Sequence, residues 1–73
     1  MRVATWNVNS IRARVDLVAT WLVDQSPEVC CLQETKCKDT DFPTETFENL
    51  GYEVAHHGLN HWNGVAILSR VGL

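Results

Sequence analysis

The sequence predicts an α/β domain in which a strand–helix–strand unit is followed by a short helix and a β-hairpin. The prediction rests on an alternating amino-terminal segment rich in Val, Thr and Trp, on an amphipathic segment after it, and on an almost continuously apolar run that ends at Gln33. With 73 residues, of which 45% are hydrophobic and three are tryptophan, the chain has the composition of an ordinary globular interior. We therefore expect one folded unit over residues 1–73.

The first strand is expected over residues 2–8, which alternate and contain several β-favouring side chains. Asn7, Asn9 and Ser10 end this strand, and each has a short polar side chain that could cap a following helix. From Ile11 onward, apolar residues recur every three or four positions, which predicts an amphipathic helix of about fifteen residues. The residues on its apolar face are Ile11, Val15, Val18, Ala19 and Leu22.

A proline separates this helix from the second strand. Pro27 disfavours a helical conformation at Ser26 and so ends the helix. Residues 28–33 then form a short strand whose nearly unbroken apolar character predicts burial on both faces. A strand, a crossover helix and a second strand form a right-handed unit with parallel strands in nearly all known cases. We therefore expect both strands to end at the same edge of the sheet.

The second half of the sequence predicts a polar loop, a short helix and a hairpin. Pro43 suits the first position of the helix, which runs to Leu50, and Gly51 suits its carboxyl-terminal cap. Two antiparallel strands are expected over residues 52–57 and 64–69, joined by a polar turn. Because the last strand suits the middle of a sheet, we expect the chain to be the amino-terminal part of a larger domain.

Charge and cysteine content give little functional information. The net charge of −3 and the pI of about 5.4 indicate no bulk attraction to nucleic acids or membranes. Without a signal peptide or an apolar span, and with cysteines that fit reduced thiols, we expect a cytoplasmic protein without a membrane partner. Cys30 and Cys31 are interpreted as small buried hydrophobic residues, and no structural zinc site is expected because no Cys-x₂-Cys pair exists. Of His56 and His57, one should face inward and one outward.

Polar side chains gather where the first two strands end. Asn7 and Asn9 follow the first strand and Glu34 follows the second, so the parallel arrangement places them near each other at one sheet edge. A carboxylate beside an amide can hold Mg²⁺, which takes oxygen ligands and needs only one or two carboxylates from protein. The alternatives are a solvated or ion-paired Glu34 and helix-capping asparagines, and spacing alone does not decide between them.

Other residues near this edge could contact a phosphate or a base. Arg12 and Lys36 could each bind a phosphate, although solvated side chains are the ordinary alternative. Trp62 lies in the polar turn beside Asn63 and Gly64, where its ring could stack on a base or sugar. A tryptophan that merely covers the end of the sheet remains the alternative.

Several motifs of the chain together resemble a known family. In order and spacing, they are similar to the opening of the exonuclease III branch of the endonuclease/exonuclease/phosphatase superfamily, and the resemblance spans essentially the whole chain. The matching segments are Thr5-Trp6-Asn7-Val8-Asn9-Ser10-Ile11-Arg12, Leu32-Gln33-Glu34-Thr35-Lys36, Phe42-Pro43, Leu50-Gly51-Tyr52 and Trp62-Asn63-Gly64-Val65-Ala66-Ile67-Leu68-Ser69-Arg70.

The resemblance implies a four-layer α/β sandwich, the DNase I-like fold, and a Mg²⁺-dependent phosphodiesterase that acts on DNA, with Mn²⁺ as an alternative ion. It further implies cutting beside abasic sites, removal of nucleotides from 3′ ends of double-stranded DNA, and a monomeric full-length protein. By position, Glu34 would be the main metal ligand, and Asn7 would support the metal and the scissile phosphate. The residues assigned to DNA contact are Asn9, Arg12, Lys36, Trp62, Asn63 and Gly64.

The family's water-activating aspartate and its other catalytic residues come from later parts of a longer chain, so we expect residues 1–73 alone to be inactive. Two alternatives remain open. One is a non-catalytic partial module that self-associates or binds a partner through an open sheet edge. The other keeps the superfamily but changes the substrate to a phosphoinositide or another phosphoester.

Overall fold

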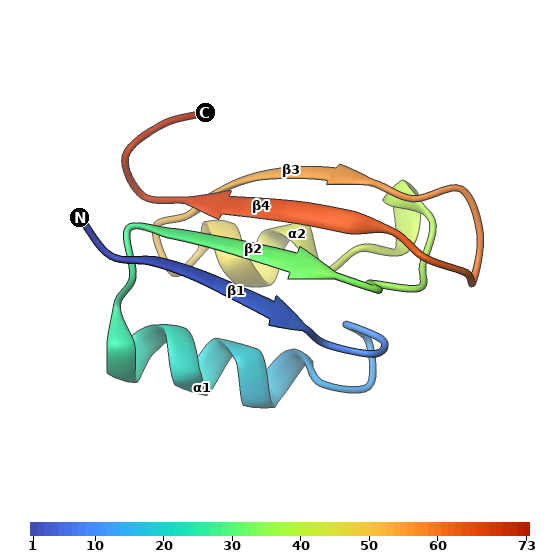
Figure 1. Ribbon diagram of the computed structural model, residues 1–73, viewed down its shortest axis with the longest axis horizontal. Coiled ribbons are helices and arrows are strands. Elements are labelled where there is room, and N and C mark those ends of the chain that lie inside the picture. The colour runs from blue at the N-terminus through green and yellow to red at the C-terminus, as the bar shows by residue number, and fades with distance from the viewer.

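The computed structural model describes all residues 1–73 and shows a mixed four-stranded sheet with two helices (Figure 1). The elements are β1 (Val3–Asn7), α1 (Val15–Gln25), β2 (Val29–Gln33), a 3₁₀ turn (Asp39–Asp41), α2 (Thr44–Glu48), β3 (Glu53–His57) and β4 (Val65–Ser69). The order of elements agrees with the prediction, and each strand begins one residue later than expected. Neither helix has the length and apolar character that a membrane crossing requires.

The strand order is β1-β2-β4-β3. β1 and β2 are parallel neighbours, in register from Val3 opposite Val29 to Asn7 opposite Gln33, which confirms the predicted strand–helix–strand unit. β4 runs antiparallel to both β2 and β3, so it lies inside the sheet, as its apolar sequence predicted. The carboxyl ends of β1 and β2 therefore lie at one end of the sheet, beside the β3–β4 turn (Figure 1).

The predicted start of α1 is wrong. The helix begins at Val15 and has 11 residues, while Ile11 is fully buried in the turn before it. The amide of Ile11 donates to the carbonyl oxygen of Thr35 at 3.0 Å, a bond to another loop that holds this turn out of the helix. Arg14 occupies the N-cap position without a side-chain cap bond, so none of the three predicted capping residues caps α1. The hydroxyl of Ser10 instead accepts the Ala13 amide at 3.4 Å within the turn.

α2 differs from the prediction by a residue or two at each end. Pro43 is its N-cap rather than its first residue, and the helix ends at Glu48. Gly51 lies two residues after the C-cap and has a φ of +92°, a left-handed conformation that glycine adopts at no steric cost. The chain reverses there and enters β3.

One face of the sheet forms the core, and both helices cover that face. The strand register places Trp6, Leu32, Ala66 and His56 in one row across the four strands. Trp21 of α1 contacts one end of the row through Trp6, with ring centroids 5.5 Å apart. At the other end, Phe42 stacks on His56 with a centroid distance of 4.4 Å. The buried hydrophobic cluster is Val8, Ile11, Val18, Leu22, Cys30, Leu32, Cys37, Phe42, Phe47, Tyr52, Ala66 and Leu68.

The opposite face of the sheet is open, so the predicted burial of β2 on both faces is wrong within these residues. Cys30 and Leu32 are buried, but Cys31 on the other face is only half-buried. On the same open face, Val65 and Ile67 of β4 are exposed. The apolar sequence of β2 predicted that both faces would be buried. Within residues 1–73, only the face that the helices cover is buried.

Candidate functional site

The carboxyl ends of β1 and β2 bring Asn7 and Glu34 into direct contact. The Asn7 side-chain amide, Nδ2, donates a hydrogen bond of 2.6 Å to Glu34 Oε2. This contact follows from the register, which pairs Asn7 with the residue before Glu34. The expected juxtaposition of these two residues, 27 positions apart in the sequence, is confirmed.

Backbone hydrogen bonds join three loops at this end of the sheet. The loop after β2 accepts bonds from the loop after β1 and donates bonds to the residues before β4. These bonds run from the amides of Val8, Ser10 and Ile11 to the carbonyls of Gln33, Glu34 and Thr35, and from the amides of Thr35 and Lys36 to the carbonyls of Gly64 and Asn63. Their lengths lie between 2.7 and 3.1 Å. Glu34 and its neighbours are therefore held from both sides.

Left-handed backbone conformations concentrate in the same loops. Five of the six non-glycine residues with positive φ lie here, at Asn9, Ser10, Glu34, Lys36 and Asn63. Such conformations cost free energy for residues with a Cβ and persist where the surrounding contacts impose them. Strain of this kind accumulates at functional sites, where it directs side chains that a relaxed loop would leave free.

The side chains at this end bind one another. Lys36 Nζ donates to Asn9 Oδ1 at 2.5 Å and lies 3.6 Å from Glu34 Oε1. Asn7 Oδ1 accepts the Asn9 backbone amide at 3.1 Å. The Glu34 side chain is 44% exposed, so its oxygens keep lone pairs that face solvent. Asn7, Asn9, Glu34 and Lys36 thus form one connected polar cluster.

The donors of this cluster fit a hard divalent cation. Glu34 supplies two carboxylate oxygens and the asparagines supply amide oxygens, which are the ligand types Mg²⁺ prefers while keeping several waters. No group of three or more His, Cys, Asp or Glu side chains is arranged to hold a metal.

The buried Cys30 is not an activated thiol. Burial, and next the neighbouring Cys31, raise the pKa of the Cys30 thiol to about 11, so this thiol stays protonated at neutral pH.

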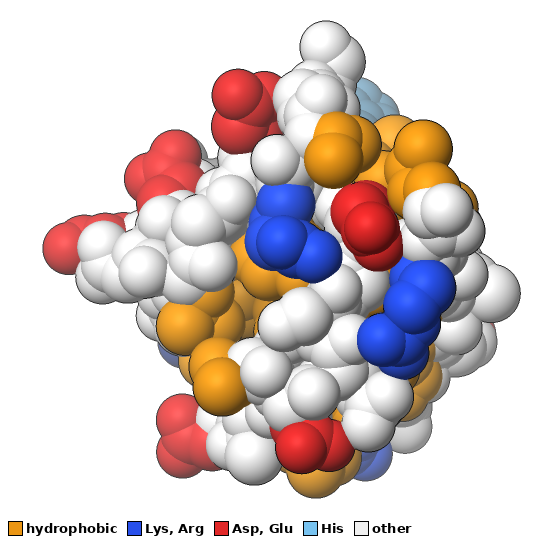
Figure 2. Space-filling view, turned by 90° about the vertical axis from the view of Figure 1, so that its left-hand side faces the viewer, with side chains coloured by type: hydrophobic (Ala, Val, Ile, Leu, Met, Phe, Trp, Pro, Cys, Tyr) orange, Lys and Arg blue, Asp and Glu red, His pale blue; other side chains and the backbone are white.

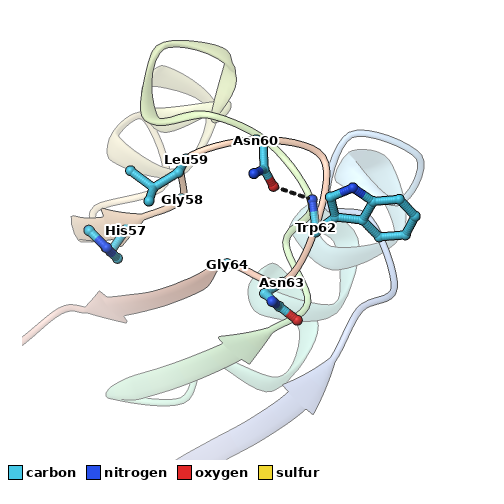
Figure 3. A pocket seen from close by; sticks show the side chains of 7 residues that line it. All are labelled: His57, Gly58, Leu59, Asn60, Trp62, Asn63 and Gly64. Atoms are coloured by element: carbon cyan, nitrogen blue, oxygen red, sulfur yellow. Dashed lines mark hydrogen bonds between the residues drawn. The ribbon is translucent and has the colours of Figure 1, made fainter.

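The β3–β4 turn places Trp62 beside the cluster. Residues 57–60 and 62–64 surround a small cavity of about 200 Å³, shown in Figure 3. The Trp62 amide donates to Asn60 Oδ1 at 2.8 Å, and the indole ring, 73% exposed, points away from the cavity (Figure 3). Asn63 and Gly64 connect the turn to the Glu34 loop through their carbonyls. The turn thus exposes an aromatic ring while hydrogen bonds hold its backbone in place.

Arg12 keeps its polar group free of contacts that would compete with a ligand. Arg12 is exposed in the turn before α1, and its guanidinium makes no hydrogen bond or ion pair within the chain. It can therefore bind an external anion without first breaking an internal contact. Lys36 and Asn9, in contrast, bind each other.

Sequence reasoning missed one part of this end, a buried chain of hydrogen bonds behind Glu34. Thr35 Oγ1 lies 2.8 Å from His56 Nε2, and His56 Nδ1 lies 2.6 Å from Asp39 Oδ1. The Gly58 amide, and less strongly the His56 ring, hold the pKa of Asp39 below its usual range. Strand alternation correctly predicted that one of two adjacent histidines faces inward, and it is His56, whose side chain is 4% exposed. No sequence pattern predicted the contact between His56 and Asp39.

Comparison with known proteins identifies the family. The profile of the Endonuclease/Exonuclease/phosphatase family matches residues 4–73. The chain belongs to this family. Within it, the chain is an exonuclease III-like member, and it is 41% identical over 70 residues to exodeoxyribonuclease III of Haemophilus influenzae. That match covers 96% of this chain and 26% of the relative.

Solved structures of the family share the fold. An AP endonuclease from Archaeoglobus fulgidus matches with a TM-score of 0.94 and 44% identity, over 96% of this chain and 27% of that protein. A 3′ phosphatase from Neisseria, solved with a product DNA hairpin, matches with a TM-score of 0.92 and 38% identity over the same shares. The predicted fold, a portion of the DNase I-like α/β sandwich, is confirmed, and the chain spans about a quarter of these relatives.

Proposed function

We propose that the chain is the amino-terminal part of a Mg²⁺-dependent DNA-repair phosphodiesterase that cuts beside abasic sites and removes nucleotides from 3′ ends. The observation that supports this most directly is the Asn7–Glu34 pair, joined at 2.6 Å between parallel strands and held by strained loops. Relatives named as an exodeoxyribonuclease and an AP endonuclease support the reaction class. A relative solved with product DNA supports the substrate class.

In this proposal Glu34 holds the metal ion and Asn7 orients Glu34. A carboxylate only accepts hydrogen bonds, so the 2.6 Å contact fixes Asn7 Nδ2 as the donor and leaves the second lone pair of each Glu34 oxygen free. Lys36, 3.6 Å from Oε1, limits the rotation of the carboxylate and adds positive charge near the phosphate. When bound, Mg²⁺, or Mn²⁺ in its place, would neutralise phosphoryl charge and stabilise the departing 3′-oxygen.

The DNA would lie across the loops around this cluster. Arg12 supplies an unengaged guanidinium for a backbone phosphate, and Trp62 supplies an exposed ring for stacking on a base or sugar. Asn63 and Gly64 bring the backbone of the turn close to the loop that carries Glu34, next to Lys36 and Asn9. The net charge of −3 makes this a local contact rather than a bulk electrostatic attraction.

Residues 1–73 contain one carboxylate of the proposed site and no water-activating base, so we propose that they are inactive alone. A reducing, cytoplasmic location and a monomeric full-length protein complete the proposal. The three cysteines, all free, are compatible with the reducing location.

The test is Glu34→Gln in the full-length protein, assayed on duplex DNA with an abasic site in the presence of Mg²⁺. We expect the cutting rate to fall about 100-fold or more, the usual cost of removing one preorganised electrostatic group. Glu28→Gln is the matched control, because Glu28 is a carboxylate at the opposite end of the sheet and should leave the rate unchanged. Cutting by Glu34→Gln at the parent rate would refute the proposal, and faster turnover of a phosphoinositide in a substrate panel would redirect it.

The strand order supports a second candidate. β1 and β3 are the sheet edges, and each leaves backbone groups unpaired on one side. A non-catalytic module could pair with a second copy or a partner there. Sedimentation of the 73-residue chain decides this, since a folded monomer at all concentrations excludes self-association.

A further inference from the structure

The buried hydrogen-bonded chain Thr35–His56–Asp39 lies directly behind Glu34 and has no part in the proposed chemistry. Thr35 is fully buried and the His56 side chain is 4% exposed, whereas Asp39 reaches solvent. The three residues come from the loop after β2, from β3 and from the 3₁₀ turn. The chain therefore connects the loop that carries Glu34 to the protein surface at Asp39.

The direction of these hydrogen bonds follows from their chemistry. The Asp39 carboxylate can only accept, so His56 Nδ1 carries a proton and donates to Oδ1 at 2.6 Å. In the neutral ring, Nε2 then has a lone pair and accepts the Thr35 hydroxyl proton at 2.8 Å. Asp39 thus selects the tautomer that His56 needs in order to accept the proton of Thr35. The Gly58 amide fixes Asp39 in turn, donating to the same oxygen at 2.9 Å.

The His56 ring and the Thr35 hydroxyl are closely packed by their neighbours. The Phe42 ring lies against the His56 ring, with centroids 4.4 Å apart and 27° between planes. A Cβ on Gly58 would lie 2.7 Å from His56 Cε1, and a Cβ on Gly64 would lie 2.2 Å from Thr35 Oγ1. The Thr35–His56 hydrogen bond therefore depends on both glycines, because a side chain at either position would displace the His56 ring or the Thr35 hydroxyl.

The position of Thr35 in the backbone lets it influence the conformation of Glu34. It lies between two left-handed residues, Glu34 with a φ of +55° and Lys36 with a φ of +56°. Its amide donates to Gly64 and its carbonyl accepts from Ile11, so the side-chain hydroxyl supplies its remaining constraint. If that hydroxyl loses its partner, the strained segment can relax and turn Glu34 away from Asn7.

We propose that His56 is a positioning residue that holds Glu34 in its metal-binding orientation through the hydroxyl of Thr35. The proposal rests on the proposed function, because it assigns His56 to the same metal site. It predicts that breaking the Thr35–His56 bond weakens metal binding, whereas losing a comparable bond elsewhere lowers only stability.

Two substitutions of His56 separate the two hydrogen bonds. In His56→Gln, the amide oxygen is as many bonds from Cβ as Nε2 is, so it can accept from Thr35 while Asp39 loses its partner. In His56→Asn, the amide nitrogen matches Nδ1, so it can donate to Asp39 while Thr35 loses its partner. Thr35→Val removes the same hydroxyl from the other side with little change in shape. Tyr52→Phe is the control, because it removes a buried 2.7 Å hydroxyl bond to the Pro27 carbonyl at the opposite end of the sheet.

The experiment measures Mn²⁺ affinity of the full-length variants by electron paramagnetic resonance, without DNA, together with their thermal unfolding. We expect His56→Asn and Thr35→Val to weaken Mn²⁺ binding about 10-fold, the usual effect of losing a partner of a metal ligand. His56→Gln should restore most of the affinity, and Tyr52→Phe should leave it unchanged. In DNA cutting, excess Mg²⁺ should restore the rate of His56→Asn but not that of Glu34→Gln.

The outcomes distinguish the two proposals. If Glu34→Gln weakens Mn²⁺ binding but His56→Asn and Thr35→Val bind as tightly as the parent, His56 is purely structural and the inference is overturned. The same holds if His56→Gln loses as much affinity as His56→Asn. If Glu34→Gln itself binds Mn²⁺ normally, the proposed metal site fails, and the role assigned to His56 fails with it.

Discussion

The two ends of the sheet both carry charged side chains, but they use them differently. At the end shown in Figure 2, where β1 and β2 begin, acidic, basic and hydrophobic side chains are interspersed. Arg2 donates to the Gln25 carbonyl at 2.6 Å, and Arg70 donates to the carbonyls of Ser26 and Pro27 at 2.6 and 3.1 Å. The Tyr52 hydroxyl also donates to Pro27. At this end the donors therefore bind the backbone carbonyls of the last α1 residue and of the two residues that follow it.

At the other end the polar side chains bind one another. Asn7, Asn9, Glu34 and Lys36 form a cluster whose carboxylate still faces solvent, and α1 begins there without a side-chain cap. The last carbonyls of a helix need partners, and at the first end the Arg2 guanidinium supplies one to Gln25, the last residue of α1. Charge alone therefore does not mark a binding site. Strained backbone and uncommitted lone pairs distinguish the end that can bind a ligand from the end that stabilises the fold.

Two glycines with left-handed backbone test whether the strained end is also the tightly packed end. Gly64 has a φ of +93°, and an added Cβ would lie 2.2 Å from Thr35 Oγ1, whereas Gly72 has a φ of +101° and open space. We expect Gly72→Ala to lower the free energy of unfolding by about 1 kcal/mol through backbone strain alone. Gly64→Ala should cost about 3 kcal/mol, because the steric clash adds to the same strain. Urea unfolding of both variants measures the difference, and equal losses would contradict the packing argument.

Arg70 and Arg12 form the next pair, one arginine from each end. Arg70→Met removes two charged hydrogen bonds to carbonyls and the guanidinium 5.9 Å above the Tyr52 ring, so it should destabilise the protein by about 2 kcal/mol. DNA cutting should stay at the parent rate when assayed below the unfolding transition. Arg12→Ala should change stability by less than about 0.5 kcal/mol, because its exposed guanidinium makes no hydrogen bond or ion pair within the chain. It should weaken DNA binding and lower the salt dependence by about one phosphate contact. If Arg70→Met weakened DNA binding and Arg12→Ala destabilised the fold, the roles assigned to the two ends would be wrong.

The sequence predicted much of this contrast because local rules governed it. The strand–helix–strand rule placed Asn7 beside Glu34, and strand alternation turned one of the two histidines inward. The start of α1 could not be predicted from periodicity, since the Ile11 amide forms a tertiary bond to the Thr35 carbonyl instead of a helical one. The Asp39–His56 contact also depends on loop conformation across 17 residues, which no local pattern records.

Trp62 and Leu59 test whether the exposed turn belongs to the ligand-binding end. Both side chains are exposed in the same turn, by 73% and 75%. Trp62→Ala should weaken binding of duplex DNA by about 1 to 2 kcal/mol, within the range for loss of a stacking aromatic ring. Leu59→Ala should bind DNA as the parent does, and neither variant should change thermal unfolding. Fluorescence anisotropy with labelled DNA measures both, and equal affinities for the two variants would remove Trp62 from the interface.

The smallest expected effect is a pH dependence that both ends share. A backbone amide lowers the pKa of one carboxyl at each end, the Arg2 amide for Glu28 and the Gly58 amide for Asp39. A carboxyl with a lowered pKa in the folded state stabilises the protein fully above its unfolded pKa, and the contribution disappears as pH falls through the folded pKa. The free energy of unfolding should therefore decline below the ordinary pKa values of 4.5 and 3.8, and decline less steeply in Glu28→Gln and in Asp39→Asn. Because both carboxyls reach solvent, each change should be small, and urea unfolding from neutral to acidic pH measures it.

Metal binding should distinguish the same two variants. Only Asp39→Asn should also weaken Mn²⁺ binding, since only that carboxyl selects the tautomer of His56. Equal Mn²⁺ affinity in the two variants would show that the two ends use their carboxylates in the same way.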